Sequence, residues 1–122
     1  MERRRCFMGD MNDIMSSLTL ELRRGTIVLS VLSQLNTPQY GYELVKNLEE
    51  KGISIDTNTL YPLLRRLEKQ ELLISEWETD ENKPRKYYKR TDFGNQVYEQ
   101  LLEQWKQMTF SINQLLYGSG EL

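Results

Sequence analysis

The chain has 122 residues, a formal net charge of −2 and no histidine, so Ser-His-Asp and Cys-His catalysis are excluded. Its one cysteine, Cys6, excludes an intrachain disulfide and, without histidine, a Cys/His zinc site. Phosphate-binding glycine loops are absent and no apolar run reaches the roughly 20 residues that span a bilayer. We therefore expect a cytoplasmic protein that makes no membrane contact, has no cofactor and is not an enzyme.

The N-terminal third of the chain predicts two helices. Residues 1–10 are polar or irregular and carry three arginines in a row, so they are either a mobile terminus or a basic arm for a nucleic-acid backbone. Apolar residues at three- and four-residue spacing predict an amphipathic helix over 11–22. Gly25 either interrupts this helix or marks a close packing point. Residues 27–35 are apolar on most sides, which is typical of a helix at the centre of a core.

The middle of the chain predicts two further helices. A turn over 36–39 leads to a short helix over 42–48, which ends near Gly52, a residue suited to a helix C-terminus. Asp56 is a good N-cap for the next helix. Because Pro62 has no backbone donor, we expect this next helix to start late or to start bent.

The helix that follows Asp56 divides into an apolar and a polar face. The buried stripe is predicted to contain Leu60, Leu63, Leu64 and Leu67. The opposite face carries Asn58, Tyr61, Arg65 and Lys69, with Arg66 at its edge. Taken alone, this helix is either an ordinary surface helix or one that reads bases in the major groove of DNA.

A basic hairpin follows this helix. Strands are predicted over 72–79 and 85–90, with a turn over 80–84 between them. Cations crowd the turn and the second strand, where they repel one another unless a polyanion is near: Lys83, Arg85, Lys86, Lys89 and Arg90. We expect either Tyr87 or Tyr88 to pack on the helices, and Trp77 to be structural. A helix with an arginine-bearing outer face and a basic hairpin together predict a winged helix, mainly α with a small β-hairpin.

The last helix is longer than the small domain can cover. Thr91 and Asp92 cap a predicted helix of about 26 residues, on the order of 39 Å. Its apolar seam begins at Phe93 and continues beyond the reach of the core, so it needs a partner, and a second copy of the chain is the simplest one. We predict a homodimer interface that contains Val97, Leu101, Trp105, Met108, Ile112 and Leu115.

Several segments of the chain resemble the PadR family of transcriptional regulators, in its smaller subfamily with a short C-terminal helix. They are Arg24-Gly25-Thr26, Tyr40-Gly41-Tyr42-Glu43-Leu44, the TLYPLLRRLE run from Thr59 to Glu68, the PRKYY run from Pro84 to Tyr88, and Thr91-Asp92-Phe93-Gly94. The resemblance covers about residues 22–117, and the combination of TLYPLLRRLE with PRKYY is specific. The hairpin tip departs from the family pattern, because Asn82-Lys83 stands where glycine and arginine often precede the proline.

The resemblance implies a homodimeric winged-helix repressor that binds double-stranded DNA. Residues 1–22 would then be an N-terminal arm and helix, 23–91 the DNA-binding domain, and 92–122 the C-terminal dimerisation helix and tail. The DNA contacts carried over from the family are Tyr42, Asn58, Thr59, Tyr61, Arg65, Lys83, Arg85 and Lys86. Two such subunits would bind an inverted repeat.

The resemblance also implies release from DNA by a small aromatic or drug-like effector at or near the dimer interface. Two copies of Trp105 across a two-fold axis can hold a flat ring by stacking. Met15, Leu18 and Met108 can line such a space, because methionine adapts to varied shapes. The alternative is that Trp105 is simply a buried interface residue.

A second hypothesis does without DNA. In it, the winged helix serves protein contact or ligand sequestration. The pI of about 5.3 supports this reading, as does an acidic run beside the basic hairpin: Glu76, Glu78, Asp80 and Glu81.

Overall fold

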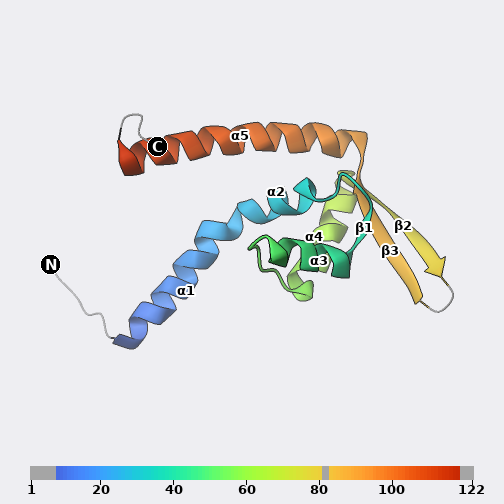
Figure 1. The fold of residues 1–122 in the computed structure, drawn as a ribbon, viewed down its shortest axis with the longest axis horizontal. Coiled ribbons are helices and arrows are strands. Elements are labelled where there is room, and N and C mark those ends of the chain that lie inside the picture. Colours follow the sequence, from blue (N-terminus) through green and yellow to red (C-terminus); the bar gives the residue numbers. More distant parts are fainter. Residues whose placement is uncertain (1–7, 81–82, 119–122) are drawn as a thin grey trace.

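The structure is a computed structural model that describes residues 8–80 and 83–118 (Figure 1). Its elements in chain order are α1 (Met8–Arg24), α2 (Thr26–Ser33), β1 (Gln39–Tyr40), α3 (Gly41–Glu50), α4 (Thr57–Lys69), β2 (Leu73–Asp80), β3 (Lys83–Arg90) and α5 (Asp92–Tyr117). The fold is mainly α with a small antiparallel sheet, which confirms the predicted fold class. The sheet has a third strand, β1, where the sequence predicted only a turn.

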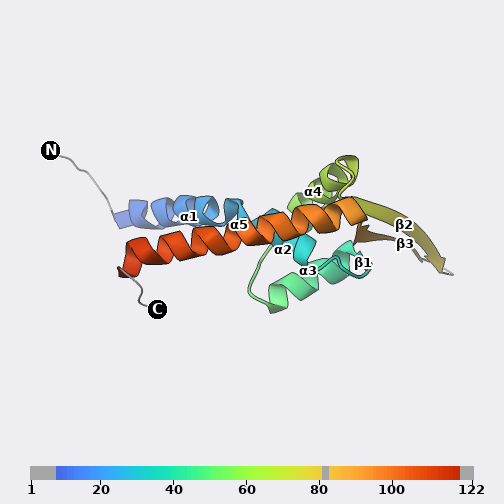
Figure 2. The ribbon, with the colours of Figure 1, turned by 90° about the horizontal axis from the view of Figure 1, so that it is seen from above.

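One end of the molecule is formed by helices and the other by a β-hairpin. Helices α1 and α5 both extend to one end of the molecule, while the β2–β3 hairpin projects from the other (Figures 1 and 2). Helices α2, α3 and α4 lie between these two ends. The hairpin and α4 are therefore separated from the free ends of α1 and α5.

The core is built from leucines of several helices. The side chains buried in it are Val31, Leu32, Leu35, Leu44, Leu48, Leu60, Leu64, Leu67, Leu72, Leu73 and Tyr88. Three of the four leucines predicted on the inner face of α4 are fully buried, and Leu63 is partly buried. Burying one such side chain contributes about 1.5–3 kcal/mol relative to leaving it exposed. The leucine stripe therefore fixes which face of α4 remains in solvent.

The start of α4 differs from the prediction in one respect. Asp56 is the N-cap as predicted, because its Oδ1 accepts a hydrogen bond from the amide of Thr59 at 2.9 Å. The helix nevertheless begins directly at Thr57 and contains Pro62, so the expectation of a late start was wrong. The donor that Pro62 lacks would have bonded the carbonyl of Asn58, and water can bond that carbonyl instead because Asn58 is exposed.

The hairpin is longer than predicted. Strands β2 and β3 pair from Leu73 opposite Arg90 to Asp80 opposite Lys83, so the turn does not extend to residue 84. Pro84 lies within β3, opposite Thr79. A proline is tolerated there because β1 pairs with β3 only at Tyr87 and Tyr88, which leaves the other edge of β3 free at Pro84.

The junction between the hairpin and α5 is held by several hydrogen bonds. Thr91 Oγ1 accepts from the amide of Gly94 at 2.8 Å and donates to the carbonyl of Glu71 at 2.7 Å. A side chain at Gly94 would collide with the carbonyl of Leu72, so glycine is required there. Thr91 therefore caps α5 as predicted and docks its first turn on the segment between α4 and β2.

Arg90 also belongs to this junction. Its Nη1 donates to the carbonyl of Leu32, and its Nε donates to Oδ1 of Asn95 at 2.7 Å. The guanidinium carbon lies 4.3 Å from the ring centre of Tyr98. The sequence grouped Arg90 with the cations of the hairpin, but its side chain joins α2 to α5.

The structure of the N-terminal region decides between the two roles considered for Gly25, but not between those considered for residues 1–10. Gly25 interrupts the helical run between α1 and α2, and nothing lies within 4 Å of where a side chain would begin, so it is no close packing point. The three arginines at 3–5 lie outside the described residues, so the basic arm remains a prediction.

Candidate nucleic-acid interface

The outer face of α4 is polar and exposed. Asn58, Arg65 and Lys69 all lie on this face, opposite the buried leucines, and Arg66 lies at its edge. This is the division that a helix needs if one side is anchored in a core and the other faces base edges.

A groove separates α4 from the hairpin. It has a volume of about 360 Å³ and is lined by Tyr40, Gly41, Tyr61, Arg65, Trp77, Pro84, Arg85, Lys86 and Tyr88. Four residues of the predicted DNA-contacting set therefore meet around one groove: Tyr61, Arg65, Arg85 and Lys86. The other four do not line it, namely Tyr42, Asn58, Thr59 and Lys83.

Lys86 is held between the hairpin and α4. Its Nζ lies 3.8 Å from Oε1 of Glu68, and both side chains are about a third exposed, at 32% and 33%. The same Nζ lies 5.5 Å from the ring centre of Tyr88 and 5.9 Å from that of Trp77. An ion pair this exposed is weak, so a phosphate can compete with Glu68 for the ammonium group.

Arg85 borders the groove, but alternation along β3 directs its side chain to the face opposite that of Lys86, beside two tyrosines. Its guanidinium carbon is 4.8 Å from the ring centre of Tyr40, and Tyr40 meets Tyr87 edge to face at 5.4 Å. The pKa of Tyr87 is raised above its ordinary value because desolvation disfavours the phenolate; the carboxylate of Glu78 adds to this, whereas Arg85 opposes it. Tyr87 is therefore neutral near pH 7, and the charged groups that act on it are Arg85 and Glu78.

The side chain of Tyr61 is partly buried, which is more than we expect of a residue that serves only to contact DNA. Its ring lies across the first residue of α3, where any side chain at Gly41 would collide with it. It also packs against the core while being partly accessible from the groove. Tyr61 therefore fixes the position of α4 relative to α3.

Of the two tyrosines Tyr87 and Tyr88, one was predicted to pack on the helices. Tyr88 is the one that does so.

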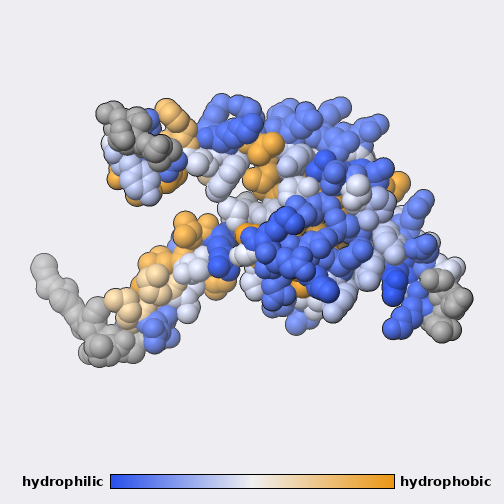
Figure 3. All heavy atoms as spheres, viewed as in Figure 1, coloured by the Kyte–Doolittle hydropathy of each residue, from blue (hydrophilic) through white to orange (hydrophobic). Residues whose placement is uncertain are grey.

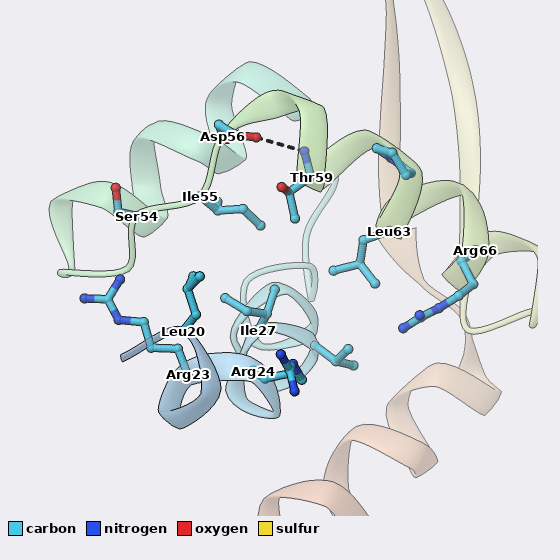
Figure 4. A pocket seen from close by; sticks show the side chains of 12 residues that line it. Leu20, Arg23, Arg24, Ile27, Ser54, Ile55, Asp56, Thr59, Leu63 and Arg66 are labelled. Carbon is cyan, nitrogen blue, oxygen red and sulfur yellow. Dashed lines mark hydrogen bonds between the residues drawn. The ribbon is translucent and has the colours of Figure 1, made fainter. Parts of the chain in front are cut away.

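Thr59 lies on the flank of α4 that faces away from the hairpin. A second hollow, of about 660 Å³, lies there between α4 and the end of α1. Figure 4 shows Arg23 and Arg24 of α1 and Arg66 of α4 around this hollow. Only Thr59 of the predicted set lines it, beside the Asp56 cap.

Comparison with known proteins gives the family. The model of the "Transcriptional regulator PadR-like family" matches residues 28–100, which is more than half of the chain. The chain belongs to the PadR family. This confirms the resemblance seen in the sequence, and the family consists of DNA-binding transcriptional regulators rather than enzymes.

Individual PadR relatives agree in sequence and structure. A PadR-family regulator from Eggerthella lenta is 54% identical with a TM-score of 0.83, covering 88% of this chain and 96% of that one. A PadR-like transcription factor from Bacteroides fragilis is 32% identical with a TM-score of 0.68, covering 81% and 98%. Transcriptional regulator Rv3488 of Mycobacterium tuberculosis is 32% identical over 75 residues, 61% of this chain and 70% of its own.

PadR-family regulators typically dimerise, and α1 and α5 leave a large apolar surface exposed. Apolar side chains gather on both helices (Figure 3): Met11, Ile14, Met15, Leu18 and Leu22 on α1, and Trp105, Met108, Ile112 and Leu115 on α5. The predicted seam of α5 thus divides into two parts. Val97 and Leu101 pack against the core of their own chain, and the residues from Trp105 onward are left without such cover.

A hollow of about 870 Å³ lies between α5 and the α1–α2 junction of this PadR chain. Trp105, Met108 and Ile112 line it from α5, and Leu22 and Val28 line it from the other side. Of the four residues predicted to hold an effector, Trp105 and Met108 line this hollow, whereas Met15 and Leu18 do not.

The described residues 8–80 and 83–118 contain no cluster of three acidic or cysteine side chains that could hold a metal ion. Within the same ranges, every helix is too short or too polar to cross a bilayer.

Proposed function

We propose that the protein is a cytoplasmic, homodimeric repressor that binds an inverted repeat in double-stranded DNA. The observation that carries this proposal is the groove in which Arg65 of α4 and Lys86 of the hairpin meet. Cations from two elements that flank one groove suit a phosphate backbone that passes between a helix in the major groove and a hairpin beside it.

In this arrangement α4 is the reading helix. Arg65 can donate to guanine or phosphate, and Asn58 can make a bidentate contact with adenine. Lys83, Arg85 and Lys86 contact the backbone from the hairpin. Thr59 on the far flank of α4, and Tyr42, which is 60% exposed at the start of α3, add backbone contacts. The DNA-binding domain is then residues 23–91.

The apolar side chains that α1 and α5 leave exposed favour dimerisation. The second half of α5 and the exposed face of α1 pack against their counterparts in a second copy, through residues 1–22 and 92–122. Leucine, isoleucine and tryptophan side chains support this, because a monomer would leave them in water at a cost of roughly 25 cal/mol per Å². A two-fold dimer presents two reading helices about one turn of DNA apart, and this geometry selects an inverted repeat.

An effector site completes the proposal. Trp105 is 41% exposed and lines the hollow beside α5 with Met108, so a small aromatic or drug-like molecule can stack there. Met15 and Leu18 lie on the exposed face of α1 and join the site only when the partner subunit closes over it. Binding that alters how the two subunits pack would change the spacing of the reading helices and release DNA.

The test is the salt dependence of DNA binding by an Arg85→Gln/Lys86→Gln double variant. Each phosphate that a cation neutralises contributes about 0.9 to the slope of log affinity against log salt, so removing two cations from each of two subunits should reduce the slope by about 3.6. Lys106→Gln is the matched control, because it removes a charge from α5 far from the groove. An unchanged slope in the double variant would contradict the proposed backbone contact.

A further inference from the structure

Trp77 is an exposed tryptophan on the hairpin. Its side chain is 64% exposed, although the sequence suggested a structural role, and it is not part of the buried core. A large apolar side chain kept in water on a projecting hairpin contributes little to stability, because most of its surface is not removed from solvent.

The register of the hairpin determines which way Trp77 faces. Trp77 pairs with Lys86, and Ser75 pairs with Tyr88 two residues along each strand. Side chains alternate between the two faces of a strand, so these four residues share one face. Tyr88 is buried against the helices, so the face that carries Trp77 is the one turned toward α4. Trp77 accordingly lines the same groove as Arg65 and Lys86.

The chemistry of this groove favours an anionic occupant with apolar parts. Arg65 and Lys86 supply positive charge on its two walls. An indole supplies a flat apolar surface and one N–H donor, and it has no acceptor. A sugar-phosphate backbone matches the positive charge, the apolar surface and the N–H donor. Its phosphate oxygens carry negative charge and accept hydrogen bonds, and its deoxyribose offers an apolar face. The bases of a duplex are stacked on one another and offer no face for the indole.

We propose that Trp77 is a DNA-contacting residue, whose indole packs on a deoxyribose while Nε1–H donates to a phosphate oxygen of the strand between α4 and the hairpin. This inference rests on the proposed DNA-binding function and adds a neutral contact to it. A neutral contact releases no counterions, so its removal lowers affinity without changing the salt slope. Removal of Lys86 changes the slope as well.

The experiment measures DNA binding of Trp77→Ala and Trp77→Phe across a range of salt concentrations. Trp77→Ala removes one hydrogen bond and the apolar packing on deoxyribose in each subunit, so it should bind about 10-fold or more weakly, with a slope equal to that of wild type. Trp77→Phe keeps the apolar packing but has no donor, so its affinity should fall between the two. Ile74→Ala is the matched control, because Ile74 is an exposed apolar residue of the same strand on the opposite face, and it should bind like wild type.

The outcomes separate this inference from the function on which it rests. Wild-type affinity in both Trp77 variants, together with a reduced slope in the Arg85→Gln/Lys86→Gln variant, would overturn the role of Trp77 and leave the DNA-binding function intact. Absence of DNA binding by the wild-type protein would overturn both. A Trp77→Ala variant with a lower slope would show that the residue acts through Lys86, which also contradicts a direct neutral contact.

Discussion

Replacing Glu68 with glutamine should tighten DNA binding. In the free protein the Glu68 carboxylate pairs with the ammonium group of Lys86 at 3.8 Å, so phosphate and carboxylate compete for the same cation. Glu68 also accepts a hydrogen bond from the hydroxyl of Ser75 through its other oxygen. A glutamine amide oxygen can keep that hydrogen bond, so Glu68→Gln removes the charge and preserves the local packing.

The size of the effect follows from the exposure of the pair. In bulk water, opposite charges 3.8 Å apart attract with about 1 kcal/mol, and partly exposed ion pairs have net values of about 0.2–1 kcal/mol. A phosphate has to displace Glu68 from Lys86 in both subunits, so breaking the two ion pairs costs about 0.4–2 kcal/mol of binding free energy per dimer. Removing this cost should tighten DNA binding by about 2- to 30-fold.

Fluorescence anisotropy with a labelled operator duplex measures this effect, and a double-mutant cycle isolates it. Glu68→Gln is compared with wild type, and then again in a Lys86→Gln background, where the gain should largely disappear. Glu103→Gln on α5 controls for the general effect of removing one negative charge. Equal gains in the two backgrounds would refute the competition between Glu68 and phosphate, since the gain would then not depend on Lys86.

Two other substitutions test the junction and the dimer. Gly94→Ala should destabilise the protein by about 2 kcal/mol or more in urea unfolding, because the new methyl group meets the Leu72 carbonyl, whereas Gly25→Ala has open space and should change stability by about 0.5 kcal/mol or less. Equal stability of the two variants would contradict the close contact of α5 with the α4–β2 segment. Ile112→Glu should give monomers in sedimentation experiments, because a dimer would bury two unpaired carboxylates, whereas Lys106→Glu should remain dimeric. A dimeric Ile112→Glu protein would argue against α5 as the interface.

The parts of the fold that the sequence predicted well are those set by local periodicity. The leucine stripe of α4, the Asp56 cap and the 26 residues of α5 all follow from spacing and from capping residues along a single segment. Strand β1 could not be found in this way. It has two residues and exists because Gln39 and Tyr40 pair with Tyr88 and Tyr87, which lie far along the chain.

Four of the eight residues predicted to contact DNA line the groove, but the sequence did not predict how they are arranged around it. Alternation along a strand shows that two faces exist, but it does not show which face the core will cover. It also does not show how far along that face the core reaches. Trp77 was assigned a structural role, but it lies nearer the hairpin tip than Tyr88 on the face turned toward α4 and is exposed there beside Lys86. Arg90 was grouped with the hairpin cations, although the carbonyl of Leu32 and the side chain of Asn95 hold it at the junction. In both cases tertiary contacts, which are absent from the local pattern, decide where the side chain lies.

Sequence-specific recognition by a two-fold dimer can be tested by selecting random duplex DNA with the purified protein at near-physiological salt and sequencing the bound pool. We expect enrichment of an inverted repeat whose half-sites are centred about 10 base pairs apart, because two α4 helices of a two-fold dimer would read adjacent turns of the major groove. A bound pool that stays random in sequence would contradict sequence-specific recognition by α4.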